Sequence, residues 1–161
     1  MEFKAPESRL QHIRPAIAVD IPSIMALERL CAMAAHWAEA QYRRAIQPTE
    51  QGRTEYLVLV AEDGLALQGF LAAHQVHPEW ELQNVVVSEE SRRTGIANRL
   101  MDEFLGRARE TDGEAVFLEV RESNDAAQAL YRKWGFEPCG RRKSYYANPI
   151  EDAMLYRLRL R

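Results

Sequence analysis

The stretch VVVSEESRRTGIANRL, residues 85–100, changes its hydrophobic pattern within a few residues. Its three valines end an apolar run that stops at Ser88, as expected of a β-strand. Ile96 and Leu100 then begin a series of apolar residues at helical spacing. Between the two patterns lie two arginines and Gly95. The sequence therefore predicts a strand, a basic turn and the first residues of an amphipathic helix.

The regions that follow this turn alternate between helix and strand. The first helix has apolar positions with a period near 3.6, namely Ile96, Leu100, Met101, Phe104, Leu105 and Ala108. Residues 114–120, EAVFLEV, predict the next strand, so this helix should form a right-handed crossover between parallel strands. Residues 123–136 predict a second helix, which Asn124 or a neighbour can cap and Gly135 can end.

The remaining regions predict the rest of a sheet. They comprise a strand from His12, helices near 21–31 and 37–46, a hairpin over 55–76 around Asp63-Gly64, a strand over 81–88 and strand-like segments around 141–147 and 152–160. Asp20 or Ser23 can cap the first of these helices. We therefore expect an α/β fold of the α+β kind, with a mixed, twisted central sheet of about six to seven strands and helices on both faces. It should form a single domain over residues 1–161, with 1–10 loosely held.

The composition disfavours several classes of protein. The 161 residues are 47% hydrophobic and 28% charged, as is usual for a globular domain. The net charge of −3 disfavours nucleic-acid binding by bulk charge. The longest apolar runs are too short to cross a membrane, and MEFKAPESRL lacks the apolar core of a signal peptide. Cys31 and Cys139 have no metal-site spacing, and so few cysteines fit a reducing cytoplasm. We therefore expect a cytoplasmic protein with no nucleic-acid, membrane or metal partner.

The basic turn has the properties of an anion site. A helix N-terminus presents unpaired N–H groups, and Gly95 would let a ligand approach the backbone closely. Arg92 and Arg93 add positive charge, which suits phosphates. The three glycines of a dinucleotide fingerprint and the Gly-Lys-Ser/Thr of a P-loop are both missing. Taken alone, Arg-x-x-Gly-x-Ala fits an ordinary basic turn better.

Its surroundings favour a specific family. VVVSEESRRTGIANRL, followed by LEVRESNDAAQALYRKWGF, resembles the GCN5-related N-acetyltransferase superfamily, whose Gln/Arg-x-x-Gly-x-Gly/Ala signature is matched by Arg92, Gly95 and Ala97. Within it, the sequence is most similar to ribosomal-protein-alanine N-acetyltransferases. They share the run that reads here from Leu118 to Phe136, and a later RR-x-YY…EDA, which reads here RRKSYY and EDA.

The resemblance implies that acetyl-CoA is the acetyl donor. Its pyrophosphate would lie on the backbone of Arg93, Thr94, Gly95, Ile96, Ala97 and Asn98, with Arg92 beside it. Its pantetheine arm would pair with the main chain of Val85, Val86 and Val87 like an added strand, and Asn124 would hydrogen-bond the same arm. Core strand is the plainer explanation for the valines, and both can hold because only backbone atoms are needed.

Glu119 is the candidate general base, since it interrupts an otherwise apolar strand. A salt bridge with Arg121, on the same strand face, is the alternative. Tyr131 is the candidate general acid, because a phenol can protonate a leaving thiolate and Tyr131 shares a helix face with Asn124. Its alternative is a core position in a stripe with Leu130 and Trp134. The resemblance favours the catalytic role for both.

The acceptor is the least defined part of the prediction. Tyr145, Tyr146 and the acidic pair Glu151-Asp152 match positions that shape the peptide end of the cleft in the family, although a twisted terminal hairpin would also explain them. We expect Tyr145 or Tyr146 to contact the substrate. His36 precedes Trp37 where many relatives have proline, in a region that borders their acceptor site. We expect an N-acetyltransferase for a protein N-terminal α-amine, such as that of a ribosomal protein, acting as a monomer or homodimer. A small amine or a lysine as acceptor, and a non-catalytic acyl-CoA-binding module, are the alternatives.

Overall fold

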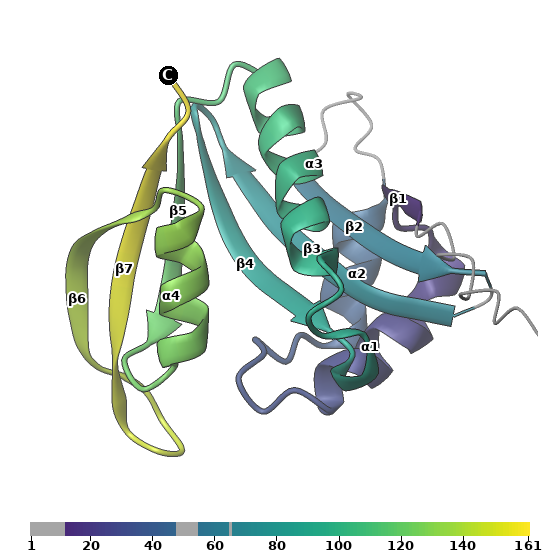
Figure 1. Ribbon diagram of the computed structural model, residues 1–161, viewed down its shortest axis with the longest axis horizontal. Helices are drawn as coiled ribbons and strands as arrows, with labels where there is room; N and C mark the ends of the chain where they lie inside the picture. Colours follow the sequence, from purple (N-terminus) through teal and green to yellow (C-terminus); the bar gives the residue numbers. More distant parts are fainter. Residues whose placement is uncertain (1–11, 48–54, 65) are drawn as a thin grey trace, which may run out of the picture.

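The computed structural model describes residues 12–47, 55–64 and 66–161 (Figure 1). Its strands are β1 (His12–Pro15), β2 (Tyr56–Asp63), β3 (Ala66–Val76), β4 (Glu79–Val87), β5 (Ala115–Arg121), β6 (Glu137–Tyr146) and β7 (Glu151–Arg159). Its helices are α1 (Ile21–Arg29), α2 (Glu39–Ile46), α3 (Ile96–Glu110) and α4 (Asp125–Lys133), with short 3-10 turns η1 (Ala18–Asp20) and η2 (Glu89–Ser91). The loosely held segment predicted at 1–10 lies outside the described residues.

The described strands form one seven-stranded sheet in the order β1-β2-β3-β4-β5-β7-β6. Strands β4 and β5 are parallel and are joined by α3, whereas the other neighbouring pairs are antiparallel. The mixed sheet and the parallel crossover are therefore as predicted.

Helices cover both faces of this sheet, as predicted. On one face, Ile24 of α1 and Tyr42 of α2 pack with Val60 and Phe70 of the hairpin. On the other face, α3 and α4 pack over strands β2 to β5 and β7, and all six apolar positions predicted for α3 are buried. No helix among residues 12–47, 55–64 and 66–161 is long and apolar enough to span a membrane.

The parallel pair separates halfway along its length. Only Glu79–Leu82 of β4 pair with Ala115–Leu118 of β5, although both strands continue beyond these residues. Where pairing stops, Ala72 and Ala73 of β3 pair with Asn84 and Leu82, so Gln83 is left without a ladder partner in a bulge. Figure 1 shows the two strands diverging from this point. The residues of β4 beyond the bulge therefore pair with β3 alone. Their other backbone edge faces the opening between β4 and β5.

The cap predicted for the first helix is only half right. Asp20 is the N-cap residue of α1, but its side chain makes no capping hydrogen bond to α1. The carboxylate instead accepts two hydrogen bonds from Arg14, at 2.8 and 2.9 Å, and one from the Ile17 N–H at 2.8 Å. A two-pronged guanidinium bond is stronger than a neutral cap, and this explains the difference.

Candidate active site

The N-terminus of α3 is open, as the anion-site prediction requires. Gly95 is its N-cap residue, with φ of 82° in the left-handed region, and Arg93 before it has φ of 65°. The side chains of Arg92, Arg93 and Thr94 are exposed, and the Thr94 hydroxyl donates to the Ser91 carbonyl. The first N–H groups of the helix, from Ile96 onward, therefore lie beside exposed positive charge.

Asn98 has a structural contact that the sequence did not indicate. Its Oδ1 accepts a 2.6 Å hydrogen bond from the indole nitrogen of Trp134, which follows α4. The bond fastens the first turn of α3 to the end of α4. The Asn98 side chain is thus engaged, while its backbone belongs to the predicted anion site.

Val85, Val86 and Val87 lie beyond the bulge in β4, where the strand has left β5. Val86 is buried and its neighbours are half-buried, so the core-strand explanation holds for the side chains. The backbone edge toward β5 has no ladder partner among the described strands. An extended chain could pair with it, as predicted for a pantetheine arm.

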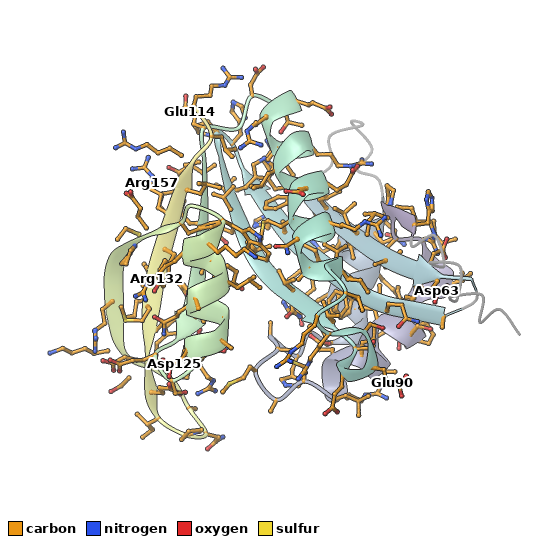
Figure 2. The ribbon with its side chains drawn as sticks, in the orientation of Figure 1. Asp63, Glu90, Glu114, Asp125, Arg132 and Arg157 are labelled. Atoms are coloured by element: carbon orange, nitrogen blue, oxygen red, sulfur yellow. The ribbon has the colours of Figure 1, made fainter. Side chains whose placement is uncertain are left out.

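Asn124 caps α4, as predicted, because its side chain accepts a 3.2 Å hydrogen bond from the Ala127 N–H. Gly135, with φ of 94°, ends the helix as expected. Figure 2 labels Asp125 at the start of α4 and Glu90 in the turn before α3, and both lie at the same end of the molecule. The positive ends of two helix dipoles therefore lie at the end of the sheet toward which β4 runs.

Glu119 is partly exposed on β5, and its partner is not the one considered from sequence. Its Oε1 lies 2.9 Å from Nε of Arg142 on β6, and a hydrogen bond with Glu119 raises the pKa of Tyr145. Arg121 instead pairs with Glu151 at 3.2 Å and lies 4.3 Å from the centre of the Tyr146 ring. The proposed salt bridge with Arg121 is therefore wrong, because β7 brings a nearer carboxylate to that arginine.

Tyr131 packs as a core residue and also faces the other tyrosines. Its ring centre lies 5.9 Å from that of Trp134, 5.8 Å from that of Phe136 and 6.5 Å from that of Tyr156. Burial, and then the neighbouring Tyr146, raise the pKa of Tyr131 to about 12. The phenol therefore keeps its proton throughout the neutral range.

Tyr146 interacts with both candidate catalytic side chains. Burial, and then the charge of Glu119, raise its pKa to about 12, and it in turn raises the pKa of Tyr131. The structure thus brings Glu119, Tyr131, Tyr145 and Tyr146 into one neighbourhood from β5, α4 and β6.

A bulge in β6 carries Tyr145 and ends at Tyr146. Arg142 pairs with Ala153 and Tyr146 with Glu151, so the residues between them face Asp152 alone. Ser144 has φ of 50°, and its N–H donates to Asp152 at 2.8 Å. That bond, and then the Arg141 guanidinium, lower the pKa of Asp152. Sequence reasoning named the two tyrosines and Asp152, but it did not find Arg142, whose contact with Glu119 depends on the pairing of β6 with β7.

The described residues offer no group of three or more His, Cys, Asp or Glu side chains that could hold a metal ion.

Comparisons with known proteins agree with this geometry. Residues 21–136 match the acetyltransferase (GNAT) family, and the chain belongs to this family. It is an N-acetyltransferase, an enzyme of the acyltransferase class, as its relatives indicate. Family members generally take the acetyl group from acetyl-CoA.

Two curated relatives are [ribosomal protein bS18]-alanine N-acetyltransferases. The one from Salmonella typhimurium is 34% identical over 104 residues, covering 63% of this chain and 69% of its own. The one from Escherichia coli K12 is 28% identical over 141 residues, covering 86% of this chain and 90% of its own. The crystal structure of the ribosomal-protein-S18-alanine N-acetyltransferase from Escherichia coli has a TM-score of 0.81 at 26% identity, covering 94% of each chain.

Proposed function

We propose that the protein transfers the acetyl group of acetyl-CoA to the α-amine at the N-terminus of a protein, such as a ribosomal protein. The names of the relatives support this acceptor, since they specify an alanine of ribosomal protein bS18. The similarity to the Escherichia coli enzyme extends over nearly the whole chain, which includes the regions around the candidate site.

The observation that carries the proposal is the opening between β4 and β5 beside the N-terminus of α3. The residues there fit acetyl-CoA. Val85–Val87 offer backbone groups to the amides of the pantetheine arm, and the backbone from Arg93 to Asn98 offers N–H groups to phosphate. Arg92 supplies further positive charge, and Asn124 lies at the start of α4, where it can reach the same arm.

In the proposed reaction the amine nitrogen attacks the thioester carbon, and the carbon–sulfur bond breaks. Glu119 accepts the proton that the amine loses, directly or through water, and Tyr131 donates a proton to the departing thiolate. A main-chain N–H of Val85–Val87 would donate to the carbonyl oxygen as negative charge develops there. A phenol is protonated throughout the neutral range, so the proton of Tyr131 is available when the thiolate forms.

A thiol-release assay with acetyl-CoA and three kinds of acceptor tests the proposal. The acceptors are peptides with a free N-terminal alanine, the same peptides with a blocked N-terminus and an internal lysine, and a small polyamine. We expect turnover with the first kind. Preference for either of the others would contradict the proposed acceptor, and no turnover with any would contradict the function.

Glu119→Gln and Tyr131→Phe should each lower turnover by about 10²-fold or more, with acetyl-CoA affinity nearly unchanged. Glu103→Gln on α3 and Tyr56→Phe on β2 make the same chemical changes and serve as controls, since phenylalanine at position 56 keeps the ring that packs on Trp37. If both site variants match their controls when chemistry limits turnover, the catalytic assignment is wrong.

A further inference from the structure

A buried carboxylate joins three elements on the face of the sheet opposite α3 and α4. Glu28 of α1 is only 2% exposed. Its Oε1 accepts a 2.7 Å hydrogen bond from the Trp37 N–H and a 3.2 Å bond from Nδ2 of Asn84. One oxygen atom therefore connects α1, the segment before α2, and β4.

Stability alone gives little reason for a carboxylate at this position. Both donors that the described residues offer Glu28 are neutral, and a buried carboxylate without a cation is costly to desolvate. The hydroxyl of fully buried Tyr42 lies beside Glu28 and Asn84, although it makes no hydrogen bond of good geometry with the described residues. Burial, and then the Glu28 charge, raise the pKa of Tyr42 well above its usual value. An apolar side chain at position 28 would remove the desolvation cost, but it would also release the loop and the strand.

The loop held in this way is residues 30–38, between α1 and α2. Its backbone turns at His36, with φ of 52°, and the Trp37 ring then packs on Tyr42 at 5.1 Å and on Tyr56 at 6.3 Å. Earlier in the same loop, Leu30 is 86% exposed. The loop therefore has one end fastened to the core by Glu28 and an exposed part that can meet another molecule.

Asn84, the residue of β4 that Glu28 binds, lies at the edge of the candidate site. Asn84 directly follows the bulge at Gln83 and precedes Val85–Val87. Glu119 lies on the same sheet face as Asn84, because its neighbour Leu118 packs on the other face with the residues beneath α3 and α4. An amine that gives its proton to Glu119 would thus approach from the face that the loop occupies.

We propose that Glu28 is a positioning residue, which fixes residues 30–38 against β4 and so forms the acceptor side of the site. The inference rests on the proposed function for the identity of the acceptor. It predicts an effect on the use of the amine rather than of acetyl-CoA, whose proposed contacts lie at α3, α4 and the edge of β4.

The kinetic test uses Glu28→Ala and Glu28→Gln in the full chain, with a peptide that has a free N-terminal alanine. Glu28→Ala should raise the KM for the peptide about tenfold and change the KM for acetyl-CoA by less than about twofold. Glu28→Gln keeps an acceptor oxygen, so its KM for the peptide should rise by less than about threefold. Glu39→Ala, which removes an exposed carboxylate from α2, is the control and should change neither constant.

Amide hydrogen exchange over residues 30–38 provides a second readout that needs no activity. Exchange should be about tenfold faster in Glu28→Ala and in Asn84→Ala than in the wild type or Glu39→Ala. Asn84→Ala also serves if Glu28→Ala fails to fold. Equal changes in both KM values, no change in either, or unchanged exchange would overturn the inference. A wild type that acetylates no amine would overturn the proposed function alone, since the exchange measurement still decides whether Glu28 fixes the loop.

Discussion

Gly95→Ala isolates the backbone requirement at the start of α3. Gly95 has φ of 82°, and a Cβ built there would meet no atom within 4 Å. Because nothing clashes, the cost is that of holding an L-residue in the left-handed region, about 1–2 kcal/mol. One kcal/mol changes the Tm of a protein of this size by about 2–4 °C, so the Tm should fall by about 2–8 °C.

Gly106→Ala is the matched control, because it makes the same substitution within the same helix. A Cβ at Gly106 also has no neighbour within 4 Å, but this position is inside α3. Alanine there should stabilise the protein by about 0.5–1 kcal/mol, and the Tm should rise. Calorimetric unfolding of both variants measures the two shifts. A Tm for Gly95→Ala that equals or exceeds that of the wild type would refute the reasoning about this turn.

Three further changes test separate parts of the structure. Replacing Arg92 and Arg93 together by alanine should weaken CoA binding more than dephospho-CoA binding in calorimetric titrations, since both arginines are exposed beside the anion site; equal weakening would contradict this placement. Raising the pH from 10 to 12 should destabilise the wild type by about 2 kcal/mol more than Tyr131→Phe in urea unfolding. The sign follows because the raised pKa of Tyr131 stabilises the folded state fully below pH 10, and this contribution is lost as the pH rises toward 12. If the stabilities of the two proteins changed with pH in parallel, Tyr131 would not be shielded from solvent. Trp134→Phe should cost about 1 kcal/mol through its lost bond to Asn98, and adding Asn98→Ala should cost little more; additive effects in urea unfolding would mean that the bond contributes nothing.

The regular elements were predictable because their patterns are local. The apolar period from Ile96 to Ala108 identified the buried face of α3, and Gly135 marked the end of α4. The separation of β4 from β5 was not predictable from spacing, because a bulge is defined by the residues opposite it. The alternation of apolar and polar residues breaks at Gln83-Asn84, but such a break does not by itself show which residues lie opposite, and the family resemblance alone indicated an opening there.

The candidate site was likewise predictable only in part. The resemblance named Glu119, Tyr131 and the two adjacent tyrosines, and the structure brings them together. It could not name the partner of Glu119, because Arg142 lies on β6, two strands away in the order β5-β7-β6. Glu28 was also missed, since a glutamate on an amphipathic helix normally faces solvent, and its hydrogen bonds to Trp37 in the returning loop and to Asn84 of β4 are visible only in the structure.

The two carboxylates on this face of the sheet are held in ways that suit opposite tasks. The Glu119–Arg142 pair is partly exposed, with 30% and 56% of the two side chains accessible, and such pairs are generally worth only about 0–1 kcal/mol. An acceptor ammonium can therefore replace Arg142 at little cost, which the proposed base requires before it can take the proton. Glu28 is enclosed with its donors, and removing either donor would leave a buried charge with one hydrogen bond fewer. Exchange of partners is thus easy at Glu119 and unfavourable at Glu28, so the first can take part in each reaction cycle while the second keeps the surrounding loop in place.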